Sequence, residues 1–142
     1  MADENQSPAG GVTAHLTIAG GRGQEAVKFY EQAFGASEEM RHLADDGKRL
    51  MHAHLKVNGG SLMLNDDFPE YRDGGDARPP AGVTLHLQVP DPDAAWDKAT
   101  AAGAKVVFPL ENQFWGDRYG QVEDPFGNPL CFVDAATLFT GR

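Results

Sequence analysis

The stretch FWGDRYGQVEDPFGNPLCFV, residues 114–133, contains two candidate β-strands on either side of one tight turn. The turn is the segment DPFGN, residues 124–128. Pro125 fixes its backbone φ at about −65°, and Gly127 accepts the positive φ that such turns can require. The residues on both sides of the turn are typical of strands, so the pattern predicts a β-hairpin. We expect the segments before this hairpin to pair with it.

Length and composition limit the kind of protein this chain can be. With 142 residues, of which 41% are hydrophobic, it is long enough for one compact domain with a sizeable core. Lys and Arg number 12 against 21 Asp and Glu, and the net charge of −9 disfavours nucleic acid as a partner. There is no apolar run of membrane-span length and no apolar signal core, so we expect no membrane association. The single cysteine fits a reducing cytoplasm, where we expect the protein.

The first half of the chain shows both strand-like and helix-like hydrophobic patterns. Residues 1–11 are polar and small, which predicts a flexible tail before a single domain at 12–142. Within that domain, apolar side chains recur along one face of a helix over residues 24–34, and Gly35 is suited to end it. The predicted order is β-α-β-β-β, with strands at residues 12–19, 37–44, 49–57 and 61–65.

The second half repeats this order after a linker. Residues 66–81 are rich in Asp, Gly and Pro and separate a first module at 12–65 from a second at 82–134. Two motifs recur at the same offset, since 34 to 102 and 62 to 130 are both 68 residues apart. This repeat indicates an internal duplication. The predicted fold class is α+β, with two βαβββ modules forming a trough-shaped mixed β-sheet and the helices on its outer face.

Polar side chains gather on one face of the predicted sheet. Because side chains alternate along a strand, we expect Met51 to face the helix and Leu50 to face the trough. The trough then carries His15, Thr17, His52, His54, Thr84 and His86. These side chains predict a pocket for a small ligand; the alternative is a solvated face with internal hydrogen bonds, and their convergence favours the pocket. The sequence does not place His42.

Two further groups of residues lie outside the strands. Trp115 is a candidate for the pocket mouth, and Arg118 for binding an anionic group. The alternative is structural, with Trp115 packing at the edge and Arg118 paired with a nearby aspartate. In the linker, Phe68 and Tyr71 are candidates for a lid or for contacts with a second subunit.

Four motifs carry a resemblance to a known family: DPFGN at 124–128, WGDR at 115–118, AFGA at 33–36 and LMHAHL at 50–55. Over residues 12–133 the chain resembles the vicinal oxygen chelate superfamily, also called the glyoxalase/bleomycin-resistance/dioxygenase superfamily, and within it the PhnB-like branch. The resemblance implies a small-molecule-binding protein with its ligand in the sheet trough. The alternatives are a divalent-metal-dependent lyase, isomerase or thiol transferase, and a dimeric scaffold without a specific ligand.

The resemblance also implies where a metal would bind. Metal-using relatives hold a divalent ion with His, Gln and Glu residues from the first and last strands of the two modules. His15 matches the first of these positions; the second falls near Thr84, with His86 two residues later, and the usual Glu is replaced by Cys131. A carboxylate suits a hard octahedral site, whereas a thiolate favours tetrahedral zinc, so the alternative is an unusual zinc site of His15, His86 and Cys131. The missing Glu argues against the enzyme.

Assembly is the last property that the resemblance bears on. In relatives the modules pair edge to edge, either within one chain or between two chains. An unpaired sheet edge exposes N–H and C=O groups that invite another strand, and two-fold closure is the commonest form of a soluble homo-oligomer. We therefore expect a homodimer with a small molecule as its ligand.

Overall fold

The structure is a computed structural model that describes residues 8–71 and 81–134. Residues 1–7 of the tail predicted at 1–11 and residues 72–80 of the linker predicted at 66–81 lie outside the described residues. The described chain forms two compact units, one with strands β1 to β4 and most of helix α1, the other with helix α2 and strands β5 to β8. No helix in these described ranges has both the length and the apolar composition that a membrane span requires.

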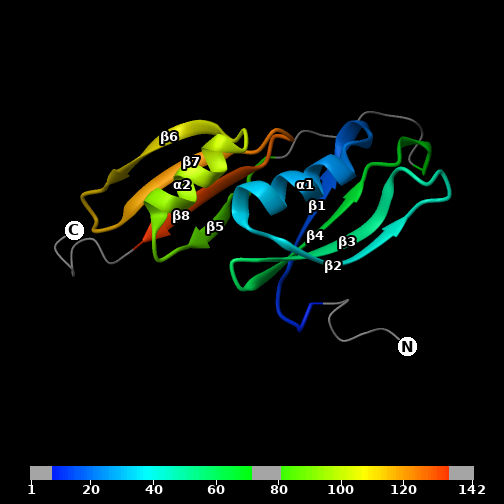
Figure 1. The fold of residues 1–142 in the computed structure, drawn as a ribbon, viewed down its shortest axis with the longest axis horizontal. Helices are drawn as coiled ribbons and strands as arrows, with labels where there is room; N and C mark the ends of the chain where they lie inside the picture. The colour runs from blue at the N-terminus through cyan, green and yellow to red at the C-terminus, as the bar shows by residue number, and fades with distance from the viewer. Residues whose placement is uncertain (1–7, 72–80, 135–142) are drawn as a thin grey trace. The chain divides into compact units, whose positions relative to one another are not determined.

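The first unit has the predicted β-α-β-β-β order (Figure 1). Its sheet has the strand order β1-β4-β3-β2, in which β1 runs parallel to β4 and the other pairs are antiparallel. Two short 3-10 turns, η2 and η3, follow β1 and β4. The elements are β1 Ala14–Ile18, η2 Ala19–Gly21, α1 Gly23–Phe34, β2 Ser37–Leu43, β3 Leu50–Val57, β4 Gly60–Asp66 and η3 Pro69–Tyr71.

The second unit repeats the same topology, with the strand order β5-β8-β7-β6 and β5 parallel to β8. Asp91 caps the helix because its Oδ1 accepts a hydrogen bond from the backbone N–H of Ala94 at 3.1 Å. The α+β class and the two βαβββ modules are thus confirmed. The elements are β5 Leu85–Gln88, α2 Pro92–Ala101, β6 Lys105–Asn112, β7 Arg118–Glu123 and β8 Pro129–Asp134.

Strand register confirms the duplication and gives the offset of 68 for the last strand of each module, while the first strands are offset by 71. Met63 on β4 lies opposite His15 on β1, and Cys131 on β8 lies opposite His86 on β5. The residues on either side of Met63, Leu62 and Leu64, are buried and face the helix side of the sheet. The two modules therefore place equivalent residues at equivalent points of equivalent sheets.

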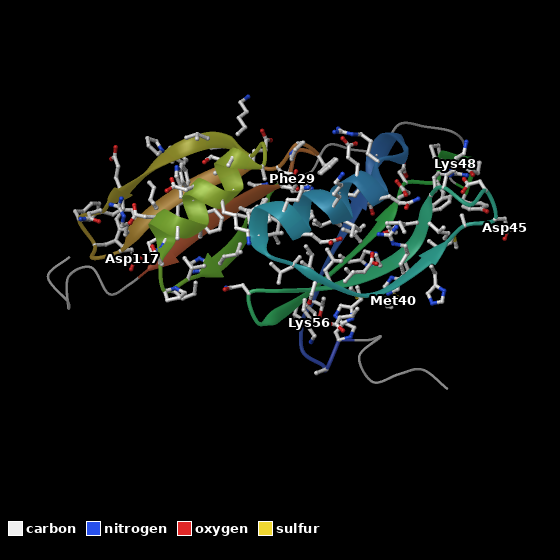
Figure 2. All side chains as sticks on the ribbon, in the orientation of Figure 1. Phe29, Met40, Asp45, Lys48, Lys56 and Asp117 are labelled. Atoms are coloured by element: carbon white, nitrogen blue, oxygen red, sulfur yellow. The ribbon has the colours of Figure 1, made fainter. Side chains whose placement is uncertain are left out.

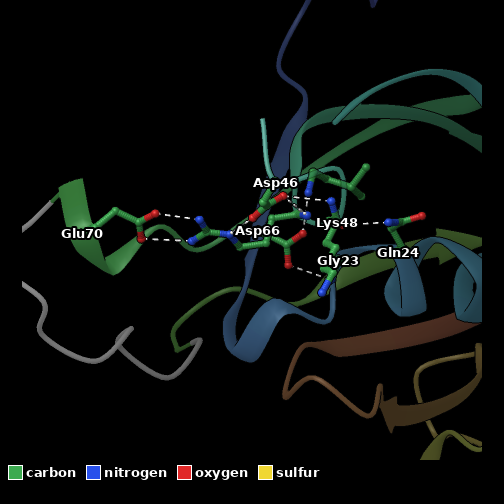
Figure 3. Close-up of polar contacts among 8 residues, drawn as sticks. Gly23, Gln24, Asp46, Lys48, Asp66 and Glu70 are labelled. Atoms are coloured by element: carbon green, nitrogen blue, oxygen red, sulfur yellow. Dashed lines mark hydrogen bonds and ion pairs between the residues drawn. The ribbon is translucent and has the colours of Figure 1, made fainter. Parts of the chain in front are cut away.

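A buried carboxylate holds the first unit together at the end of β4. Asp66 is fully buried, and its two oxygens accept hydrogen bonds from the backbone N–H of Gly23 at 2.7 Å and of Leu50 at 2.6 Å (Figure 3). Gly23 opens α1 and Leu50 opens β3, so one side chain connects three elements. A Cβ atom at Gly23 would collide with this carboxylate, which explains the glycine.

The predicted orientation at the start of β3 is wrong. Leu50 is fully buried and Met51 is 52% exposed, the reverse of the expectation. The cause is a shift in register between β2 and β3: His42 pairs with His52, but the next residue on β2, Leu43, pairs with Leu50. Because of this irregularity, the side chains of Leu50 and Met51 do not follow the alternation of the rest of β3.

The hairpin turn forms as predicted, around a second buried carboxylate. Oδ1 of Asp124 accepts hydrogen bonds from the backbone N–H groups of Phe126 at 2.9 Å and Asn128 at 2.8 Å, and Gly127 has φ of +92°. A β-branched side chain is strained at such a φ.

We expect Gly127→Val to lower the free energy of unfolding by more than about 1 kcal/mol, since valine tolerates this backbone conformation poorly. Urea denaturation measures the change. Gly60→Val is the matched control, because Gly60 has no positive φ and its added Cβ would come no nearer than 3.7 Å to the Val57 carbonyl oxygen. Equal stability of the two variants would contradict the strain argument.

Candidate functional site

In each unit the face of the sheet opposite its helix, here called the open face, carries the candidate histidines. In the first unit, four residues that pair across neighbouring strands form a row on this face: His15 on β1, Met63 on β4, His54 on β3 and Met40 on β2. Side chains of directly paired residues point to the same side, with Cβ atoms about 4.5–5.5 Å apart. The sequence thus predicted the face correctly, while Met40 was missed.

His54 is the residue on this face with the least exposure. Its side chain is completely buried, and its Nε2 lies 2.8 Å from Oγ of Ser61 on β4. Its Nδ1 is buried and has no hydrogen-bond partner among the described residues. A buried imidazole nitrogen without a partner carries a desolvation cost of about 1–3 kcal/mol, so this atom calls for an explanation.

His15 is more exposed, and its hydrogen bonds define its tautomer. Its Nε2 lies 2.7 Å from Oδ1 of Asn65, whose Nδ2 donates to the backbone carbonyl of Asp66 at 2.7 Å. Since that donation sets the orientation of the amide, Nε2 of His15 is the donor of its hydrogen bond to Oδ1. Thr17 is exposed on the same strand and pairs with Asn65. Alternation from Met63 would have identified Asn65, which the sequence interpretation overlooked.

His42, which the sequence did not place, belongs to the same face. It pairs directly with His52 across β2 and β3. The ring of His52 lies 5.9 Å from that of His15, centroid to centroid. Burial lowers the pKa of His52, and so do the neighbouring imidazoles of His15, His42 and His54. These effects favour the neutral form of His52, and four histidines of the described residues share the open face of the first unit.

The second unit has an equivalent row with different side chains: His86, Cys131, Gln121 and Phe108. Nδ1 of His86 lies 3.6 Å from Sγ of Cys131, and its Nε2 lies 3.0 Å from Oε1 of Gln88. By register, the counterpart of His15 is His86 and not Thr84, which lies just before β5. Gln121 was missed, although alternation along β7 would have found it.

The residues of the WGDR motif lie on different sides of the sheet. The guanidinium of Arg118 binds both carboxylate oxygens of Asp93 on α2, at 3.0 and 2.7 Å, and this pairing raises the pKa of Arg118. Arg118 therefore lies on the helix side. Trp115 is half exposed, its Nε1 donates to Asp117 at 2.8 Å, and its ring lies 6.1 Å from that of Tyr119. The hydroxyl of Tyr119 donates to Oε1 of Gln121, which belongs to the open-face row.

The part of the linker that the structure describes lies against the start of β3. The guanidinium of Arg49 binds Glu70, labelled in Figure 3, at 3.0 and 2.7 Å. It also lies 4.4 Å from the centroid of the Phe68 ring. The rings of Phe68 and Tyr71 are 5.7 Å apart. Arg49, Phe68 and Tyr71 border a cavity of about 200 Å³ that Met51 also lines. No pattern in the sequence predicted the contacts of Arg49.

The donor atoms do not fit the hard metal site that the resemblance implies. Over residues 8–71 and 81–134, no three His, Cys, Asp or Glu side chains are arranged to hold a metal ion. The second unit offers His86 and Cys131 side by side, but no carboxylate in that row. Burial raises the pKa of the Cys131 thiol, which disfavours the thiolate that a metal requires. No catalytic step through a metal follows from this arrangement.

Several known proteins resemble this chain in sequence. An uncharacterised protein of Mycobacterium tuberculosis, Rv0887c, is 45% identical over 128 residues, which cover 87% of this chain and 72% of that protein. The Arabidopsis thaliana protein At5g48480 is 32% identical over 127 residues, covering 82% of this chain and 74% of the relative.

Solved structures extend the comparison to the fold. The crystal structure of At5g48480 superposes with a TM-score of 0.68 at 30% identity, over 87% of this chain and 97% of that one. A PhnB protein from Bacillus cereus gives a TM-score of 0.68 at 20% identity, over 87% and 98% of the two chains, and shares the fold. Residues 13–132 match the model of one protein family. The chain belongs to the Glyoxalase/Bleomycin resistance protein/Dioxygenase superfamily.

Proposed function

We propose that the protein is a PhnB-like binding protein that holds a small organic molecule on the open faces of its sheets. The observation that supports this proposal is the cross-strand row found at the same register in both units. The row contains imidazole, amide, thiol, thioether and aromatic groups, and no Asp, Glu, Lys or Arg: His15, Met63, His54 and Met40, then His86, Cys131, Gln121 and Phe108.

The chemistry of these groups indicates the kind of ligand. Sites for small molecules combine apolar and aromatic walls with a few hydrogen-bonding groups. The second unit offers exposed rings at Phe108 and Trp115, 56% and 50% exposed, beside the amide of Gln121. Aromatic side chains favour stacking on a flat ligand. We therefore propose an uncharged aromatic ligand with hydrogen-bonding atoms, contacted in the second unit also by Thr84 and His86. His15, Thr17 and His52 are the candidate contacts on the open face of the first unit, considered by itself.

Ligand-observed NMR with indole, quinoline and benzamide as probes tests this proposal. We expect saturation transfer to at least one probe, reduced several-fold by Gln121→Leu because the hydrogen-bonding amide is lost. Arg118→Gln is the control from the helix side of the same strand. Since Arg118 pairs with Asp93, we expect that variant to bind as well as the unmodified protein. Equal binding by Gln121→Leu, or no transfer to any probe, would contradict the proposal.

Metal content separates the binding protein from the alternative of a metal-dependent enzyme. Because Cys131 replaces the usual Glu and lies beside His86 as a buried thiol, we expect the purified protein to carry well under one divalent ion per chain. Elemental analysis gives the stoichiometry. Stoichiometric zinc that disappears in a His15→Ala variant would favour the metal enzyme instead.

We further propose that the protein is a cytoplasmic homodimer. β6 is an edge strand of its sheet, and Val106, Val107 and Phe108 on it are all more than 40% exposed. An apolar edge strand of this kind is suited to pairing with another strand. Light scattering at micromolar concentration should give about twice the chain mass of 15.3 kDa, and Val107→Lys should lower it. A mass near 15.3 kDa for the unmodified protein would exclude the dimer.

A further inference from the structure

Two methionines flank the buried histidine of the first unit. Met40 on β2 and Met63 on β4 pair directly with His54 on β3, one from each side. All three side chains therefore point to the open face, as neighbours across three strands. Met40 and Met63 are partly exposed, whereas His54 between them is buried (Figure 2 labels Met40).

The imidazole of His54 is bound at one nitrogen and free at the other. Nε2 lies 2.8 Å from Oγ of Ser61, which also lies 3.5 Å from Nζ of Lys56. Nδ1 is buried without a partner among the described residues. A histidine that binds a metal has this pattern, since one ring nitrogen is oriented by a hydrogen bond and the other coordinates. When Nε2 of His54 is protonated, its hydrogen bond to Ser61 orients the ring, and the lone pair of Nδ1 is available to a metal ion.

We propose that Met40, His54 and Met63 form a binding site for a soft monovalent metal ion, Cu(I) or Ag(I). Thioether sulfur selects Cu(I) over harder divalent ions, and imidazole is a good partner ligand for copper. The three donors are uncharged, which further disfavours a divalent ion in this buried position. Methionine has three rotatable bonds, so both sulfur atoms can turn towards an ion beside Nδ1 without movement of the strands.

The second unit provides an internal comparison for this site. At the equivalent positions it has Phe108, Gln121 and Cys131, so it lacks both the thioethers and the central imidazole. The duplication therefore provides the scaffold in both units, while the soft donor set is found only in the first. The metal site shares Met40, His54 and Met63 with the open-face row proposed above to bind an organic ligand. It depends on two sulfur atoms that such a ligand does not require, so the two proposals can fail separately.

Titration with Ag(I) tests the site without a change of oxidation state. The thiol of Cys131 also binds Ag(I), so the experiment uses a Cys131→Ser background. With methyl-labelled methionine, we expect one equivalent of Ag(I) to shift the methyl signals of Met40 and Met63. The signal of Met51, which is exposed on β3 outside the row, should stay in place.

Variants then assign the ligands. Met40→Leu and Met63→Leu keep the side-chain volume and should each weaken Ag(I) binding at least tenfold, measured by calorimetry, while Met51→Leu should leave it unchanged. A parallel titration with Cu(I), kept reduced by ascorbate, should show the same ranking. If the Met40 and Met63 signals do not move, or if all three leucine variants bind equally, the inference is wrong. In that case neither thioether is a metal ligand, even if another group binds Nδ1 of His54.

Discussion

The carboxylate of Asp66 is the contact on which the geometry of the first unit depends. It accepts hydrogen bonds from the first residue of α1 and the first residue of β3, and it lies at the end of β4. Hydrogen bonds to a charged group contribute about 1.5–3 kcal/mol each when both partners are buried. The positive end of the helix dipole favours the same carboxylate. Asp66 thereby aligns the helix with the sheet and leaves the opposite face open.

The preceding residue on β4, Asn65, connects this framework to the candidate site. Asn65 points to the open face, where its Oδ1 lies 2.7 Å from Nε2 of His15, while its Nδ2 donates to the backbone carbonyl of Asp66. Adjacent residues of one strand thus serve the core on one side and the histidine face on the other. This division follows from the two-residue period of a strand, because successive side chains point to opposite faces of the sheet. One strand can therefore contribute to the core and to the candidate site at neighbouring positions.

Most of the fold follows from signals that the sequence carries locally. Alternation, turn residues and helix-ending glycines predicted both modules, and the offset of 68 predicted their equivalence. The register between neighbouring strands could not be predicted from the sequence, because alternation within one strand does not define which residues pair across strands. The shift between His42 and Leu43 therefore reversed Leu50 and Met51, and left His42 unplaced. The partner of Arg118 was also missed, because Asp93 lies on a helix turn distant in sequence.

Parallel pairing of β1 with β4 has a consequence for the order of folding. His15 and Asn65 are separated by 50 residues, whereas β3 and β4 are joined by the two-residue turn Asn58-Gly59, both with positive φ. Short turns of this kind close in microseconds, and long-range parallel contacts form more slowly because a larger loop must close first. His54 and Met63 should therefore meet early, as neighbours in a local hairpin. β1 would then add His15 last, so the complete histidine face would be a late product of folding.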